Sequence, residues 1–158
     1  MPQLTDNELA RALRSGLPAG GVGLRLGIDT VQVSAVEASL LAFGDRFLQR
    51  LFTAGEIATC AATPARCPER LAARFAAKEA AIKAFDLAEA GVDWRQIEVV
   101  SDAAGRPRLA LHGRAAALVR SLGAAEIALS LSHDGDQACA VVAALPSIAP
   151  TPHHDFND

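Results

Sequence analysis

The chain has 158 residues, of which 51% are hydrophobic and 21% charged, and its formal net charge is −3. This length fits one ordinary domain, and the apolar fraction is sufficient for a core without cross-links. The acidic balance and the lack of a basic stripe argue against nucleic acid as a partner. Cys60, Cys67 and Cys139 form neither a C-x-x-C pair nor an even set, which is typical of a reducing compartment.

No apolar run approaches the ~20 residues needed to span a bilayer. The N-terminus, with Asp6 and Glu8, lacks the basic and then apolar pattern of a signal peptide. We therefore expect a cytoplasmic protein without a membrane partner.

Residues 1–21 carry a weak amphipathic pattern that ends at a break rich in glycine and proline. We expect an N-terminal extension here, either mobile or folded as a short accessory helix. Residues 22–145 form the predicted main domain. The polar, proline-rich tail over 146–158 is predicted to be disordered.

The first half of the main domain has one apolar strand pattern followed by helical spacings. Thr53 and Glu56 match a capping box, so a short helix is expected to begin there. In chain order we predict a strand over 22–33, a helix over 36–52, the short helix after 53 and a long helix over 69–87.

The second half alternates strands, turns and one helix. We predict strands over 97–101 and 108–112 around a turn, a helix over 113–122, and strands over 125–132 and 137–145 around a turn at 133–136. Helices interleaved with hairpin-linked strands predict an α+β fold.

Two acidic residues lie in apolar surroundings. Asp29 ends a predicted strand, where it serves either as a turn or cap residue or as a rigidly held metal ligand. Glu79 lies between Lys78 and Lys83, one helical turn before Lys83. Glu79 and Lys83 either form an exposed ion pair or line a cleft. Charged side chains on a mostly apolar helix are costly unless they are paired, bound to a metal or lining a cleft. Two carboxylates and a nearby lysine can hold Mg²⁺ against a diphosphate.

Ser132 and His133 end a predicted strand just before a turn. Such a histidine is commonly structural, but a hydroxyl and an imidazole at a strand end can also hold a phosphate. A Ser–His hydrolase is discounted because no G-x-S-x-G elbow surrounds Ser132. His153 and His154 in the tail favour only adventitious metal binding.

Three ordered motifs join these residues: G-I-D at 27–29, R-F-A-A-K-E-A-A-I-K-A at 74–84 and S-L-S-H at 130–133. An I-E-V strand and a G-R-P turn over 97–107 lie between the second and the third. This ordered set resembles the phosphopantetheinyl transferases of the holo-acyl-carrier-protein synthase type, from about residue 23 to residue 145. The resemblance implies an antiparallel sheet packed with one long helix and shorter helices.

The resemblance also implies transfer of the 4′-phosphopantetheine arm of coenzyme A to a serine of apo acyl carrier protein. The carrier would serve fatty-acid or polyketide biosynthesis, and the second product would be adenosine 3′,5′-bisphosphate. The family type implies a homotrimer whose sites lie between neighbouring subunits.

Residue roles are implied by the same resemblance. Asp29 and Glu79 would bind Mg²⁺, and Lys83 would stabilise or protonate the departing phosphate. Glu79, directly or through a metal-bound water, would take the serine proton. The expected coenzyme A contacts are Arg74, Lys78, Ser132 and His133, with support of the helix and the site as the alternative role of Lys78.

Because the carrier is acidic, a basic patch is expected beside the site, and Arg46 and Arg50 are the candidates. The chain departs from the family pattern at 34–36, where S-A-V replaces an acidic-basic pair, and at Asp86, where a glycine is common. These departures concern carrier choice and loop geometry rather than the reaction.

Two other functions remain open at this point. One is a module that binds coenzyme A but no longer transfers efficiently. The other is a metal-dependent hydrolase of a nucleotide diphosphate.

Overall fold

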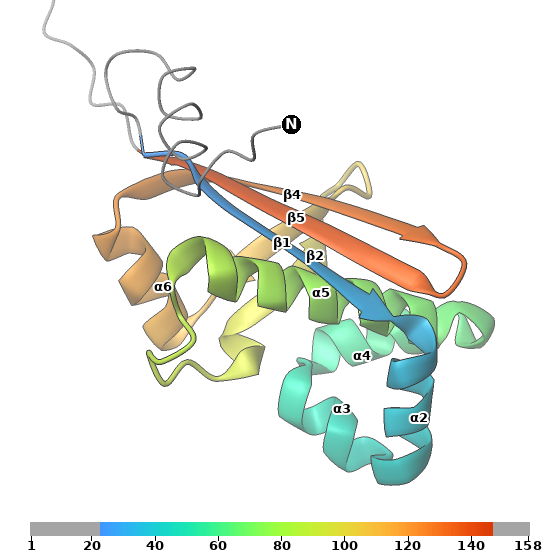
Figure 1. Ribbon diagram of the computed structural model, residues 1–158. Helices are drawn as coiled ribbons and strands as arrows, with labels where there is room; N and C mark the ends of the chain where they lie inside the picture. Colours follow the sequence, from blue (N-terminus) through green and yellow to red (C-terminus); the bar gives the residue numbers. More distant parts are fainter. Residues whose placement is uncertain (1–22, 147–158) are drawn as a thin grey trace, which may run out of the picture.

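The computed structural model describes residues 23–146 (Figure 1). The N-terminal extension expected over 1–21, and the tail after residue 146, lie outside the described residues. A three-stranded antiparallel sheet lies across one long helix, α5 (Cys67–Phe85). The sheet has the order β1-β5-β4, and its strands are β1 (Arg25–Gln32), β4 (Ala124–Asp134) and β5 (Gln137–Pro146).

Helix α5 (Cys67–Phe85) confirms the predicted long helix. Its interior is free of glycine and proline, and its one proline, Pro68, lies in the first turn, where a missing N–H is tolerated. The helix packs on the sheet through small side chains, and these alanines are buried: Ala72, Ala76, Ala77, Ala80, Ala81 and Ala84. Such small contacts let the helix and the sheet approach closely.

The closest approach is at Gly27 of β1. A Cβ atom at this position would lie 1.9 Å from the Ala80 carbonyl oxygen and 2.8 Å from the Ala84 nitrogen. Both neighbours are backbone atoms of α5 and cannot move aside as a flexible side chain would. The glycine of the G-I-D motif therefore sets how near the strand can come to the helix.

Three short helices gather at one end of α5 (Figure 1). They are α2 (Val33–Phe43), α3 (Asp45–Leu51) and α4 (Ala54–Ala61). The prediction of one helix over 36–52 was wrong, because Gly44, with φ 51° and ψ −130°, separates α2 from α3. The predicted capping box is confirmed: Thr53 Oγ1 accepts from Glu56 N, and Glu56 Oε2 accepts from Thr53 N.

The remaining elements are a second pair of strands, one more helix and two short 3₁₀ helices. Strands β2 (Ile97–Ser101) and β3 (Pro107–Leu111) form a separate antiparallel pair, and α6 (Gly113–Ser121) follows them. Two short 3₁₀ helices, η1 (Pro64–Arg66) and η2 (Trp94–Gln96), lie in the connections. The predicted turn at 133–136 is shorter than expected, because β4 continues through Asp134. The α+β prediction is confirmed.

The two faces of the three-stranded sheet differ in burial. Alternate β5 residues on the α5 side, from Ala138 to Ala144, are fully buried or nearly so. On the opposite face Leu26 is 60% exposed and Ile28 57% exposed. This outer face of the sheet therefore carries large apolar side chains on β1 that the described residues leave exposed.

Candidate active site

Asp29 and Lys83 meet where β1 crosses α5. Asp29 lies opposite Ala140 in the antiparallel register, and Ala140 is buried on the α5 side. Since directly opposed residues share a sheet face, the Asp29 side chain also points toward α5. Lys83 Nζ donates to Asp29 Oδ1 at 2.6 Å and to the Ile28 carbonyl oxygen at 3.3 Å.

Glu79 lies one turn before Lys83 on the same helix. Its pKa is raised, chiefly because partial burial disfavours the charged form and also because the Asp29 carboxylate is near; Lys83 opposes this shift. Among the described residues no ion pair joins Glu79 to Lys83, whose partner is Asp29. The alternative of an ion pair within the helix is therefore not realised, and Lys83 pairs with the strand.

The donor set of this site fits Mg²⁺. Within residues 23–146 no three His, Cys, Asp or Glu side chains gather as a complete protein cage. Two neighbouring carboxylates are nevertheless present, and the charge of Asp29 raises the pKa of Glu79. A divalent cation would relieve this repulsion, and Mg²⁺ is commonly held by one or two carboxylates together with substrate phosphates.

Lys83 supplies positive charge at the same place. Its pKa is raised, first because its ammonium group hydrogen-bonds to Asp29, so it is protonated at neutral pH. The side chain is 54% exposed, and its ammonium group can therefore also donate to a ligand. The cluster presents two carboxylates and one ammonium group on one face of α5.

Lys78 lies elsewhere, although it precedes Glu79 in sequence. Its side chain has 0% exposure, and Nζ donates to Glu56 Oε2 at 2.9 Å, to the Trp94 carbonyl at 3.1 Å and to the Ile97 carbonyl. Burial lowers its pKa, and Glu56 opposes this shift. The direct coenzyme A contact expected of Lys78 does not fit this position, because all three N–H donors of the lysine are used inside the protein.

Arg74 lies one turn before Lys78 and is only 8% exposed. Its Nη1 donates to the Arg70 carbonyl at 3.3 Å, and its buried Nε has no hydrogen-bond partner among the described residues. The guanidinium lies near the thiol of Cys60, whose pKa burial raises to about 11 and Arg74 lowers in part. This N–H is itself buried, so in this arrangement the Arg74 Nε is closed to a ligand from solvent.

A second polar cluster surrounds His133 at the start of α5. Arg66 Nη2 lies 3.2 Å from His133 Nε2 and 2.7 Å from Glu69 Oε1. Sequence reasoning missed Arg66, which stands in a proline-punctuated loop; its only signal was an acid three residues later. Ser132 lies opposite Cys139 in the register and so on the outer sheet face, away from Asp29. The structure therefore brings His133 to α5 but not Ser132.

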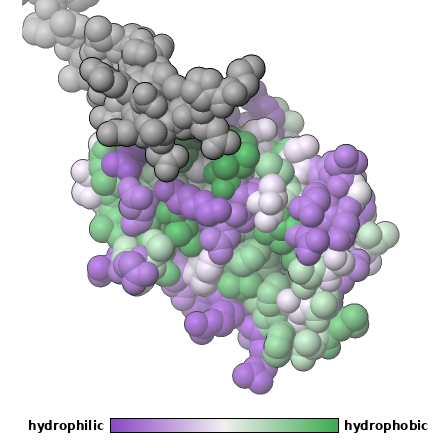
Figure 2. Space-filling model, in the orientation of Figure 1, coloured by the Kyte–Doolittle hydropathy of each residue, from purple (hydrophilic) through white to green (hydrophobic). Residues whose placement is uncertain are grey.

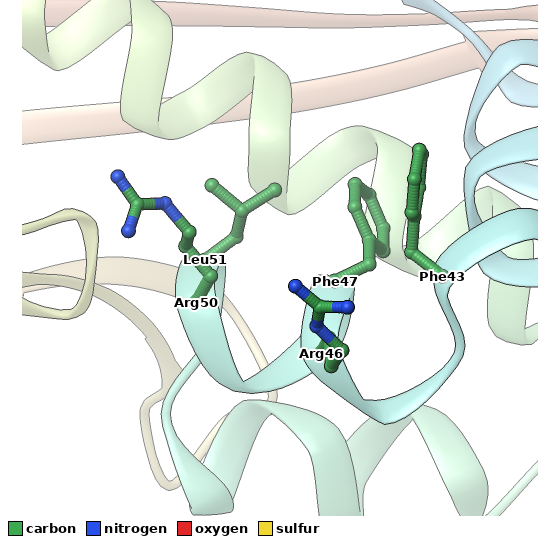
Figure 3. A pocket seen from close by; sticks show the side chains of 5 residues that line it. All are labelled: Phe43, Arg46, Phe47, Arg50 and Leu51. Carbon is green, nitrogen blue, oxygen red and sulfur yellow. The ribbon is translucent and has the colours of Figure 1, made fainter.

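Arg46 and Arg50 line a pocket of about 280 Å³ on α3. Figure 3 shows the rings of Phe43 and Phe47 standing next to one another above Arg46, while the Arg50 guanidinium points away beside Leu51. Arg46 and Arg50 have no ion-pair partner within residues 23–146. The pocket therefore combines apolar side chains with the Arg46 guanidinium, and Arg50 adds a second positive charge at its edge.

Comparison with known proteins identifies the family. The sequence model of the 4′-phosphopantetheinyl transferase superfamily matches residues 25–142. The chain belongs to this superfamily. A holo-[acyl-carrier-protein] synthase from Solidesulfovibrio magneticus is 49% identical over 74% of this chain and 94% of the relative. A namesake from Moorella thermoacetica is 45% identical, over 75% of this chain and 91% of the relative.

Solved structures agree on the fold and on the holo-acyl-carrier-protein synthase type. The chain is similar to an ACPS–CoA complex from Chronobacterium ammoniagenes, with a TM-score of 0.69 and 34% identity over 80% of this chain and 99% of that one. It is also similar to a holo-[acyl-carrier-protein] synthase from Helicobacter pylori in complex with coenzyme A, with a TM-score of 0.66 and 26% identity over 75% and 98% of the two chains. None of the described helices is long and apolar enough to cross a membrane.

Proposed function

We infer that this chain is a holo-acyl-carrier-protein synthase: it transfers phosphopantetheine from coenzyme A to a serine of apo acyl carrier protein. The observation that carries this conclusion is the meeting of Asp29, Glu79 and Lys83 across β1 and α5, in a chain that belongs to the family. Adenosine 3′,5′-bisphosphate is the second product. Fatty-acid synthesis is the pathway served by acyl carrier proteins of this kind.

Asp29 and Glu79 are proposed to hold Mg²⁺ together with the coenzyme A diphosphate. A bound Mg²⁺ supplies positive charge that stabilises the negative charge developing on the phosphate oxygens during transfer. The two carboxylates come from different elements, so the distance between β1 and α5 sets the separation of the ligands. Gly27 therefore contributes to the site although it carries no side chain.

Lys83 is proposed to act on the leaving group, and Glu79 on the attacking serine. The protonated Lys83 ammonium group donates to the leaving phosphate and stabilises the charge that collects there. Glu79 accepts the proton of the carrier serine as its oxygen attacks, a role that suits a carboxylate of raised pKa. Asp29 holds the Lys83 ammonium group in place through the 2.6 Å hydrogen bond.

The adenosine phosphates are proposed to lie toward the start of α5. Arg66 and His133 lie in contact there, and the mostly buried Arg74 lies between this pair and Lys78 along the helix. Glu69 and Glu79 are ten residues apart, which corresponds to about 15 Å along the helix. An extended ligand such as coenzyme A can reach groups that are separated on this scale.

The α3 pocket is proposed as the contact for the carrier. Cationic Arg46 and Arg50 complement an acidic partner, and the Phe43 and Phe47 rings offer apolar contact. Figure 2 shows hydrophobic surface beside hydrophilic surface where α2 and α3 lie, and Leu41 of α2 is 90% exposed.

Ser34, one of the departures from the family pattern, forms hydrogen bonds to the β4–β5 turn. Ser34 Oγ donates to Asp136 Oδ2 at 2.6 Å, and Ser34 N donates to Asp136 Oδ1 at 2.8 Å. A carrier contact at this position is thus replaced by a link within the chain. Arg46 and Arg50 on α3 are left as the proposed basic contacts.

We also propose a homotrimer. Its support in this chain is the outer face of the three-stranded sheet, where Leu26, Ile28 and Leu145 are 60%, 57% and 46% exposed. Contiguous apolar surface of this kind is typical of a protein–protein contact. Sedimentation at several concentrations tests the subunit number, and a monomer at all of them would contradict the trimer.

One assay tests the function. The chain is incubated with coenzyme A, Mg²⁺ and apo acyl carrier protein, and the intact mass of the carrier is measured. Gain of one phosphopantetheine group per carrier supports the transferase. Binding of coenzyme A without a mass gain on any carrier indicates a non-catalytic module, and release of adenosine bisphosphate with an unmodified carrier indicates a hydrolase.

A further inference from the structure

Small side chains make up most of the contact surface of α5. The buried residues along the helix are mostly alanines, whose single methyl groups do not interlock as branched side chains do. Core packing of the right volume but without complementary shape gives a fold before it gives one unique arrangement. Besides Leu71, Phe85 and the close contact at Gly27, directional polar contacts can define how α5 is turned about its own axis.

Lys78 of α5 and Glu56 of α4 form a buried charged pair, and both side chains have 0% exposure. Glu56 accepts from Lys78 Nζ at 2.9 Å through Oε2 and from the Val99 backbone N–H at 2.9 Å through Oε1. Lys78 also reaches two carbonyl oxygens, those of Trp94 and Ile97. The pair thus connects α5 with α4, η2 and β2.

The hydrogen bonds of Lys78 and Glu56 are directional, and breaking them costs free energy. A buried charge that loses its partner is strongly unfavourable, so rotations of α5 that separate Lys78 from Glu56 are excluded. The side chain also lies over the Phe52 ring, with Nζ 5.6 Å from the ring centroid. A rotation of α5 would stretch or break several of these contacts at once.

The rotation of α5 decides where the neighbouring residue points. A helix with side chains has a radius of about 5–6 Å, so a turn of roughly 20° moves the surface groups by about 2 Å. A displacement of about 1 Å can cost about 10²-fold in rate. The place of Glu79 and Lys83 opposite Asp29 therefore depends on the contacts made by Lys78.

We propose that Lys78 is a positioning residue, which through Glu56 and the Trp94 and Ile97 carbonyls fixes the rotation of α5 and so aims Glu79 and Lys83 at Asp29. It does not contact the substrate. This inference rests on the metal and diphosphate site proposed above. It assigns the lysine of the K-E-A motif a role separate from that of the glutamate beside it.

The test compares Lys78→Met with Val119→Ala. Methionine keeps most of the side-chain volume without the charge, whereas Val119→Ala weakens the same core without touching the polar bonds of α5. The probe is Mg²⁺, titrated by calorimetry into each chain with coenzyme A and without carrier; turnover and thermal unfolding are measured in parallel.

Lys78→Met is expected to weaken Mg²⁺ binding by about 10–100-fold, the range seen when a group supporting a metal ligand is removed. Its kcat is expected to fall by about 10²-fold, with the KM for coenzyme A changed much less. Val119→Ala is expected to lower the unfolding temperature while its Mg²⁺ affinity stays within about twofold of wild type. Equal Mg²⁺ affinity and kcat in Lys78→Met and Val119→Ala would overturn the inference.

A second variant covers the case in which Lys78→Met does not fold. Glu56→Gln keeps the side-chain volume and one carbonyl oxygen but removes the charge that pairs with Lys78, and it is expected to weaken Mg²⁺ binding in the same direction. Unchanged binding in this variant would overturn the inference as well. Failure of the wild-type chain to bind Mg²⁺ with coenzyme A would instead contradict the proposed site, and this inference with it.

Discussion

Lys83 of α5 donates a 2.6 Å hydrogen bond to Asp29 of β1, a residue 54 positions earlier in the chain. The bond raises the pKa of Lys83 and keeps its charge beside the two carboxylates. Lys83→Met is expected to lower kcat by about 10²–10³-fold, the usual cost of losing one donor to developing charge. Steady-state kinetics of carrier modification measure this.

The thermal stability of Lys83→Met serves as the control for its activity. The lysine is 54% exposed, and an exposed ion pair contributes little to folding. The unfolding temperature should therefore stay close to wild type. A variant with kcat within threefold of wild type would remove Lys83 from the reaction.

Glu79 makes the stability of the metal-free chain depend on pH. Because its pKa is raised above the ordinary value of about 4.3, the folded chain binds this proton more tightly than the unfolded chain. The contribution of Glu79 to stability therefore falls as the pH rises from its ordinary pKa through its raised one. Denaturant unfolding with a chelator should show Glu79→Gln gaining stability relative to wild type across that interval.

Mg²⁺ binding should follow the opposite trend. Protons compete with the cation for Glu79, so the affinity of the wild-type chain is expected to rise over the same interval. Stability differences that do not vary with pH would contradict a raised pKa of Glu79.

Gly27→Ala is expected to separate β1 from α5. The new Cβ would lie 1.9 Å from a backbone oxygen, and overpacking of this kind typically costs about 1–3 kcal/mol. Because Asp29 is two residues further along β1, we also expect weaker Mg²⁺ binding. Thermal unfolding and calorimetry measure the two effects.

Gly23→Ala is the matched control, since no atom lies within 4 Å of its added Cβ. It should leave both stability and Mg²⁺ binding unchanged. Equal behaviour of the two alanine variants would contradict a close strand–helix contact at Gly27.

Asp86 ends α5 in a left-handed conformation with φ 55°, and it is the one non-glycine residue with positive φ among those described. This conformation suits the glycine that the family resemblance implies at this position. Asp86→Gly is expected to stabilise the chain by about 0.5–1 kcal/mol, because the exposed pair with Arg25 at 3.5 Å contributes little. Denaturant unfolding tests it, and Gly91→Ala, at φ 65°, should have the reverse effect.

Substitution of Arg46 and Arg50 should weaken binding of the carrier but not binding of coenzyme A. Reversal of charge in the double variant Arg46→Glu/Arg50→Glu is expected to raise the KM for the carrier by about tenfold or more at low salt, with little change in the KM for coenzyme A. Arg120→Glu on α6 is the control, because this exposed arginine lies on a helix away from the pocket. Equal carrier KM values in the two charge-reversed chains would show that the pocket does not bind the carrier.

Much of the fold was predictable because its signals are local. The capping box at Thr53, the uninterrupted helix-forming run of α5 and the hairpin patterns all depend on residues close in sequence. The break at Gly44 was not predictable from periodicity, because the apolar spacing continues through it and a lone glycine is tolerated in many helices.

The sequence predicted which residues form the site better than it predicted how those residues contact one another. The motifs identified Asp29, Glu79 and Lys83, but the sequence could not show that Lys83 pairs with Asp29 instead of Glu79. Lys78 has the same chemistry as Lys83, and only the tertiary structure shows that it points inward to Glu56. Contacts between residues distant in sequence carry no local pattern, which is also why Arg66 was missed.

The most direct test of the central claim is the mass of apo acyl carrier protein after incubation with coenzyme A and Mg²⁺, using the wild-type chain and Glu79→Gln side by side. We predict one added phosphopantetheine group with wild type, and an unmodified carrier with Glu79→Gln over the same time. A carrier that stays unmodified with wild type, or is modified equally by both chains, would contradict a transferase that works through the Asp29–Glu79–Lys83 cluster.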